Sequence, residues 1–155
     1  MSFTAGQKLA ASDLDQIGST AFQFLGAAQS TSTINMTSSY QDLTGTSVTF
    51  TTQYANTKML IIGIFDCAFT NGVDIGVTGA YLVGAAVVDG VNLHASGEAH
   101  YNGQRATVSQ TWNVTLPLAG SHTVKLQATY FGPGPSGAIQ TVGASTRWSG
   151  IVFGP

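Results

Sequence analysis

The sequence of 155 residues has very few charged side chains. Asp, Glu, Lys and Arg make up only 8% of it, whereas about a quarter of an average globular protein is charged. Its surface must therefore consist largely of hydroxyl, amide and small side chains, which cost much less to bury than a full charge does. We expect a rigid part of a symmetric assembly with a large contact surface, rather than an independent enzyme.

Positive charge is not only scarce but also scattered along the chain. The five cations are Lys8, Lys58, Arg105, Lys125 and Arg147, and the formal net charge is -2. A protein that binds nucleic acid concentrates Lys and Arg on one face or stripe. The sequence therefore predicts that nucleic acid is not a partner.

Cysteine occurs only once, as Cys67 in the apolar segment 59–69. One thiol cannot form an intrachain disulfide, so a disulfide scaffold and a cysteine zinc site are both excluded. A free cysteine is among the most buried residue types. We predict that Cys67 is a small core residue and not a catalytic thiol.

Long apolar segments are also missing. The longest, residues 80–88, is much shorter than the roughly 20 residues that a membrane helix needs. The N-terminus lacks the basic start and apolar stretch of a signal peptide, since Asp13 and Asp15 interrupt any such stretch. We expect a chain that is made in a cytoplasm, does not insert into membranes, and stays soluble there or leaves by cell lysis.

Only the first 29 residues have helical character. Ser12 is a good N-cap residue, and Asp13 and Asp15 follow it in the first turn, where the helix dipole favours anions. A short helix over about residues 13–25 is predicted by apolar residues at helical spacing: Leu14, Ile17, Ala21, Phe24 and Leu25. Such a short helix is marginal alone, so it must dock elsewhere. We therefore divide the chain into segments 1–29 and 30–155.

From Thr31 onwards the apolar period changes to two, which is typical of strands. Candidate strands cover residues 31–36, 47–52, 58–69, 80–88, 91–99, 106–116, 122–130, 140–142 and 146–153. They are rich in β-branched and aromatic residues, and Asp89-Gly90 between two of them is a type I′ hairpin signal. Many short strands separated by turn signals predict an all-β sandwich or barrel.

Two parts of the sequence resemble structural proteins of viruses that infect bacteria. Residues 3–14, FTAGQKLAASDL, are similar to a start found in structural proteins of tailed bacteriophages, where it precedes a fibre or a β-domain. The remainder resembles the trimeric jelly-roll heads of the tumour-necrosis-factor and complement-globular-head type. Three segments carry this second resemblance by their order, namely 40–50, 118–128 and 147–153.

The resemblance implies a jelly-roll β-sandwich assembled as a homotrimer, which would follow the short N-terminal α-helix predicted above. It also implies that segment 1–29 binds another virion protein, of the tail or the capsid. The candidate anchoring residues are Phe3, Leu9, Leu14, Ile17, Phe22 and Phe24. Long fibres of this type usually place a shaft between anchor and head. Here only a short Ala/Ser/Thr linker at 26–32 separates the two, so the head is expected to lie close to the virion surface.

One group of residues resembles a metal site. His94, Glu98 and His100 share parity, so on an unbroken strand they would point to one face. Around a threefold axis such residues could collect a transition metal from three chains. Their loose spacing, and Gly97 between them, favour polar strand or interface residues instead. We therefore predict neither a metal nor a cofactor.

The sequence contains no pattern that identifies a catalytic nucleophile. A Gly-x-Ser-x-Gly elbow is missing, and Asp66, Asp74 and Asp89 lie in separate segments, so nothing selects a glycosidase pair. We assign Asp89 to its turn. Asp66, inside an apolar strand, is expected to end a barrel row or to pair with a Lys or Arg.

Several aromatic residues could line a sugar-binding surface, namely Tyr54, Tyr81, Tyr101, Tyr130, Trp112 and Trp148. Large rings in a small sandwich usually lie in the core or an interface, which we predict for Trp112 and Trp148. Binding residues are more often carried by loops. The candidate loops are 70–79, 101–105 and 131–138, and the candidate receptor contacts are Tyr101, Asn102, Arg105 and Tyr130.

The leading prediction is a non-enzymatic virion protein, a short tail fibre or minor tail protein that mediates host adhesion as a homotrimer. A host-surface glycan is the candidate receptor, and weak contacts repeated over many heads would provide avidity. One alternative is a capsid decoration or head-fibre protein attached to the shell. An alternative of another class is a glycan-acting or metal-dependent enzyme on the same fold.

Overall fold

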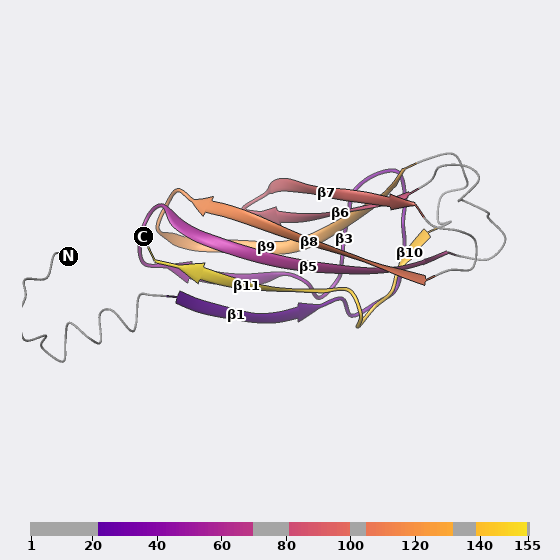
Figure 1. The fold of residues 1–155 in the computed structure, drawn as a ribbon. Coiled ribbons are helices and arrows are strands. Elements are labelled where there is room, and N and C mark those ends of the chain that lie inside the picture. Colours follow the sequence, from indigo (N-terminus) through magenta and orange to yellow (C-terminus); the bar gives the residue numbers. More distant parts are fainter. Residues whose placement is uncertain (1–21, 70–80, 100–104, 132–138, 155) are drawn as a thin grey trace, which may run out of the picture.

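Two antiparallel β-sheets pack face to face in the computed structural model, which describes residues 22–69, 81–99, 105–131 and 139–154 (Figure 1). The first sheet runs in the order β1 (Phe22–Gln29), β11 (Arg147–Phe153), β5 (Thr57–Phe69) and β8 (Arg105–Leu116). The short strands β10 (Ile139–Thr141) and β2 (Ile34–Asn35) extend it beside the second half of β5.

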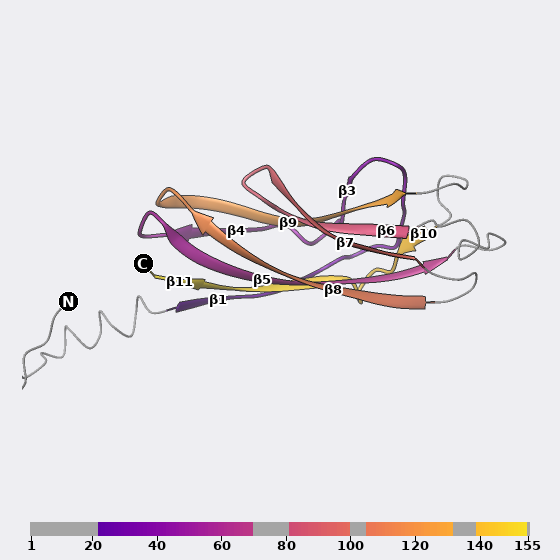
Figure 2. The same ribbon diagram turned by 45° about the horizontal axis from the view of Figure 1, so that its top comes forward.

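The second sheet is built around β9 (Gly120–Phe131). One edge of β9 pairs with β6 (Tyr81–Val88), which in turn pairs with β7 (Val91–Ala99), and the other edge pairs with β3 (Gln41–Asp42) and β4 (Val48–Thr52). Seen from a second direction, β1, β11, β5 and β8 again form one layer (Figure 2). The described residues contain no helix, and the two packed sheets confirm the prediction of an all-β sandwich.

The period-two pattern located most strands correctly. Every predicted strand from residue 47 onwards overlaps an observed one, whereas the predicted strand 31–36 is reduced to Ile34–Asn35 and Gln41–Asp42 was not predicted. The turn at Asp89-Gly90 is also confirmed, because φ is 50° at Asp89 and 83° at Gly90, as a type I′ hairpin requires.

The expected helix over 13–25 is wrong for its last residues. Residues 22–29 form β1, in which Phe22 pairs with Phe153 and Phe24 with Ile151. The apolar spacing of this segment fits either a helix or a strand, and pairing with the apolar strand β11 decides for the strand. Residues 22–29 therefore belong to the sandwich and not to a separate N-terminal segment. The rest of the expected helix lies outside the described residues.

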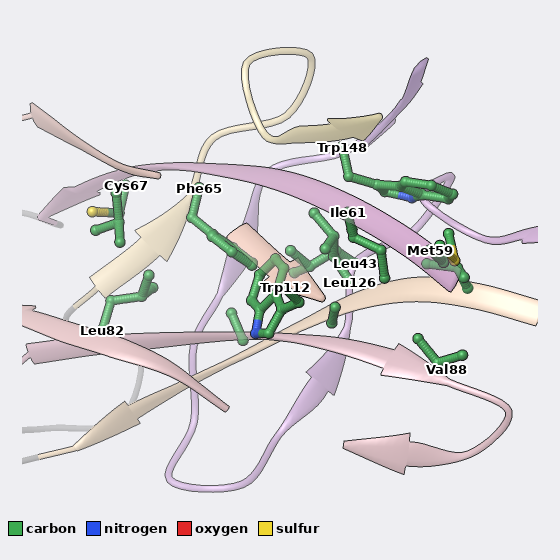
Figure 3. Packing of buried hydrophobic residues seen from close by; sticks show 14 of the residues in the cluster. Leu43, Met59, Ile61, Phe65, Cys67, Leu82, Val88, Trp112, Leu126 and Trp148 are labelled. Carbon is green, nitrogen blue, oxygen red and sulfur yellow. The ribbon is translucent and has the colours of Figure 1, made fainter. Parts of the chain in front are cut away.

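The core between the sheets is centred on aromatic rings (Figure 3). Phe65 of β5 meets Trp112 of β8 edge to face, with ring centroids 6.4 Å apart and an interplanar angle of 82°. Cys67, Trp112 and Trp148 are all buried, as predicted. Gly84 of β6 lies directly under the Phe65 ring, since a Cβ there would be 2.5 Å from it. The missing side chain thus lets the sheets approach closely at this point.

Candidate functional site

The outer face of the first sheet carries large apolar side chains in adjacent rows. Side chains alternate between the faces of a strand, and the large apolar ones that point away from the core are Phe22, Phe24, Leu60, Ile62, Ile64, Ile151 and Phe153. The register places Phe24, Ile151 and Leu60 in one row and Phe22 beside Phe153. Three polar residues share the face, with Lys58 opposite Phe153, Ser149 opposite Ile62 and Arg147 opposite Ile64. Phe22 is 68% exposed, Phe24 65% and Ile62 40%. We call this surface the outer apolar face.

The outer apolar face continues onto β8 as a neutral surface. On β8, the residues paired with Leu60, Ile62 and Ile64 are Asn113, Thr111 and Ser109, respectively. Hydroxyl and amide groups of this kind can enter an interface at a modest cost. Large exposed apolar patches on a soluble protein mark interaction sites, so this face is suited to contact with another protein surface.

A second apolar surface lies between the free edges of the two sheets. A groove of about 430 Å³ runs between the edge strands β7 and β8 and is lined mainly by Val88, Val91, Leu93, Val114, Leu116, Pro117 and Leu118. Val91 is 62% exposed and Leu118 70%. We call this groove the edge groove. It lies along a different side of the sandwich from β1, which is the opposite edge of the first sheet.

His122 connects three elements beside the edge groove in an arrangement that the sequence did not indicate. Its Nδ1 lies 2.6 Å from Oδ2 of Asp89, and its Nε2 lies 3.1 Å from both Thr52 Oγ1 and the carbonyl oxygen of Leu118. Burial raises the pKa of Asp89, but hydrogen bonds from His122 and from the Thr123 backbone outweigh it and leave that pKa below its usual value.

Thr52, His122 and Asp89 are connected in the order of a catalytic triad. The Leu118 carbonyl oxygen lies as close to His122 Nε2 as Thr52 Oγ1 does. Thr52 is also only 6% exposed. His122 therefore clamps the Asp89-Gly90 turn to β4 and to the loop before β9.

The expected partner of Asp66 is Arg105. Nε of Arg105 donates to both carboxylate oxygens of Asp66, at 2.9 and 3.0 Å, and its Nη2 donates to Asp66 and to Ser145. The hydrogen bond from Arg105 is the largest cause that lowers the pKa of Asp66 below its usual value, against the effect of burial. Arg105 was predicted as a receptor contact, and its side chain is 57% exposed while its guanidinium holds Asp66, so that prediction remains a prediction.

This ion pair predicts a specific response to acid. Because the pKa of Asp66 is lowered in the folded state, the pair stabilises the fold above the unfolded-state value of about 3.9 and stops doing so as the pH falls through the folded pKa. We expect Arg105→Gln to lower the urea midpoint at pH 7 and the difference from the wild type to shrink towards pH 2.

Lys125→Gln is the matched control for this measurement, since it breaks the pair of Lys125 with the more exposed Asp42. Exposed pairs contribute little to stability, so its effect at pH 7 should be smaller. A difference between Arg105→Gln and the wild type that stays constant from pH 7 to pH 2 would contradict the assigned role.

Two of the candidate metal ligands, His94 and Glu98, belong to β7. The backbone pairing of β7 with β6 shifts register between them, with Gly97 opposite Val83 and His94 opposite Ala85. His100 lies outside the described residues. Within the part that is described, no group of three or more His, Cys, Asp or Glu side chains is placed to hold a metal ion.

Tyr130 was expected to contact a receptor, but the structure buries it. It is only 3% exposed, because the alternate residues Val124, Leu126 and Ala128 of β9 already point into the core. Burial accordingly raises the pKa of Tyr130. The same alternation leaves Phe131 outside, where it stacks on Tyr81. The alternation of apolar side chains along β9 is the sequence signal that could have identified Phe131 as the exposed residue.

The remaining predicted residues are only partly covered. Tyr101 and Asn102 lie outside the described residues, as do the anchoring candidates Phe3, Leu9, Leu14 and Ile17. Phe22 and Phe24 are placed on the outer apolar face. No helix in the described ranges is long and apolar enough to cross a membrane.

The chain is similar to solved structures of viral particles, although no protein-family model and no curated protein matches it. The structure of infectious bursal disease virus, Gt strain, has a TM-score of 0.58 and 11% identity over 85% of this chain and 33% of that chain. The T13 particle of infectious bursal disease virus has a TM-score of 0.56 and 8% identity, over 86% and 31%. This chain thus spans about a third of their length. At such low identity, the likeness shows a jelly-roll β-sandwich fold and nothing more.

Proposed function

We propose that this chain is a non-enzymatic structural and adhesive module of a bacteriophage virion, a short tail fibre or minor tail protein that works as a homotrimer. The observation that carries the proposal is the outer apolar face. A soluble monomer rarely exposes a contiguous apolar patch of more than a few hundred Å², and here Phe22, Phe24 and Ile62 point outwards together.

Two apolar surfaces on different sides of the sandwich favour a ring. A face-to-face dimer would cover the outer apolar face and leave Val91 and Leu118 of the edge groove exposed. In a head-to-tail contact, the edge groove of one copy packs on the outer apolar face of the next, so both surfaces are covered in every copy. Such contacts form a closed ring when the rotation from one copy to the next divides a full turn evenly. A ring of three copies is the trimer that the resemblance implies.

The assembly is tested by adding one charge to the outer apolar face. Ile62 lies on the central strand β5 and is 40% exposed, so Ile62→Lys should leave the fold intact but place an unpaired charge in the contact. By light scattering we expect the wild type at three times the 16.0 kDa chain mass and the variant as a monomer.

Thr49→Lys is the control for Ile62→Lys, because Thr49 is an exposed residue on the second sheet and lies away from the proposed contact. It should remain trimeric. A monomeric wild type, or an Ile62→Lys variant that is still trimeric, would overturn the proposed assembly.

The virion location rests on the FTAGQKLAASDL segment and on the fold shared with viral particles. Antibody labelling of purified particles in electron micrographs tests it. Label at the tail supports the proposal, whereas label spread over the capsid would favour the decoration or head-fibre alternative. Label absent from particles would overturn a virion role altogether.

The non-enzymatic role is supported by the burial of Thr52, the hydroxyl beside His122, which is only 6% exposed. The purified protein should release no reducing ends from bacterial cell-wall polysaccharide. Release that is abolished by His122→Gln, in a variant that still folds, would overturn this part of the proposal.

A further inference from the structure

One exposed aromatic cluster is not used by the proposed assembly. Phe22, Phe24, Ile62 and Phe153 belong to the outer apolar face, and Val91 and Leu118 to the edge groove. The other large apolar side chains exposed in the described part are Tyr54, Tyr81 and Phe131. Tyr54 lies in the turn between β4 and β5, whereas Tyr81 and Phe131 stack on each other.

The two rings are held side by side by the second sheet. Tyr81 is the first residue of β6 and Phe131 the last of β9, and the two are paired in register. Their ring centroids lie 5.8 Å apart with an interplanar angle of 21°. Tyr81 is 37% exposed and Phe131 43%, because their neighbours Leu82 and Tyr130 are the residues that point into the core.

A loop that carries two exposed serines is hydrogen-bonded to the end of β9, on the edge that pairs with β3. The Thr37 carbonyl accepts hydrogen bonds from the Tyr130 backbone N–H at 2.9 Å and from Thr129 Oγ1 at 3.1 Å. The Thr37 backbone N–H in turn donates to Gln41 Oε1 at 2.8 Å. These bonds bring the exposed residues Ser38 and Ser39 to the end of β9.

The surroundings of the pair on β6 and β9 are uncharged. The next row on the same face holds Val83 and Thr129. The start of β6 and the end of β9, where Tyr81 and Phe131 are located, lie at the end of the sandwich opposite the start of β1 and the end of β11 (Figure 1). The proposed trimer contact uses the outer apolar face and the edge groove, and neither Tyr81 nor Phe131 belongs to these two surfaces.

We propose that Tyr81 and Phe131 form a platform for a pyranose ring of an uncharged polysaccharide. The C–H groups on one face of a pyranose carry partial positive charge and pack against the negative face of an aromatic ring. The serine hydroxyls of the neighbouring loop offer hydrogen bonds to sugar hydroxyls. This inference rests on the proposed function and gives the adhesive module its ligand class. Three weak platforms per trimer would act through avidity.

Affinity electrophoresis of the full chain in gels that contain dextran, galactomannan or arabinogalactan tests the platform. We expect at least one of these neutral polysaccharides to retard the wild type. Tyr81→Ala and Phe131→Ala should each weaken this binding by about tenfold, the size of one lost aromatic contact. Tyr54→Ala removes an equally exposed tyrosine elsewhere and should bind like the wild type.

Retardation by none of the three polysaccharides, or equal retardation of the wild type and both platform variants, would overturn the platform. Light scattering on the same samples separates this outcome from failure of the proposed function. A trimer that binds no neutral polysaccharide disproves the platform alone, whereas a monomeric wild type disproves the assembly.

Discussion

Trp148→Ala is expected to lower the free energy of unfolding by about 3–5 kcal/mol, the usual range for truncating a fully buried aromatic side chain. Trp148 is 1% exposed, and its Nε1 donates a 2.6 Å hydrogen bond to the carbonyl oxygen of Thr46. Thr46 Oγ1 in turn accepts from the backbone N–H of Leu126 in the second sheet. Trp148 therefore connects the two sheets as well as filling the core.

Urea denaturation at a fixed protein concentration measures this loss, with Trp112 as the remaining fluorescent reporter. Trp148→Phe keeps most of the ring but leaves the Thr46 carbonyl without its donor, so it should lose about 1–3 kcal/mol. Thr49→Ala is the control, because Thr49 is exposed on the second sheet, lies outside both apolar surfaces and should change stability by less than about 0.5 kcal/mol. A loss in Trp148→Ala no larger than in this control would contradict the assigned role.

Gly84→Ala is expected to destabilise the fold by about 1–3 kcal/mol, although it adds a single methyl group. The added Cβ would lie 2.5 Å from atoms of the Phe65 ring. Phe65 is fully buried and its ring packs edge to face on Trp112, so it has little room to move. The two sheets must then separate locally or the ring must leave its rotamer.

A double-mutant cycle with Phe65→Leu identifies this clash as the cause. Because leucine lacks the ring atoms that Gly84→Ala would touch, the double variant should be more stable than the sum of the two single losses by about 0.5–3 kcal/mol. Urea midpoints of the four proteins provide the comparison. Strictly additive losses would show that the Gly84 effect arises elsewhere.

Much of the fold could be predicted from the sequence because local signals and the tertiary structure agree. The period-two pattern located β5, β6, β7, β8, β9 and β11, and the Asp89-Gly90 turn was recognised by residue type alone. Asp66 was expected to pair with a Lys or Arg because an isolated carboxylate in an apolar strand is costly. Its partner is Arg105, 39 residues away.

The errors arose where local signals were ambiguous. Phe22 and Phe24 fit both a helix and a strand, and only their pairing with β11 makes them β1. Tyr130 was taken for a surface residue because of the Gly/Pro loop that follows it. The inward alternation of β9, which buries it, is the stronger constraint.

The sequence by itself determined the fold class, the low charge of the surface and the positions of most strands, because these depend on composition and on a period of two residues. Only the tertiary structure decided which strands are neighbours. The outer apolar face joins β1, β11 and β5, and the aromatic pair joins Tyr81 to Phe131, 50 positions later. Such surfaces depend on sheet order and register, and these are set by the packing of the two sheets as a whole.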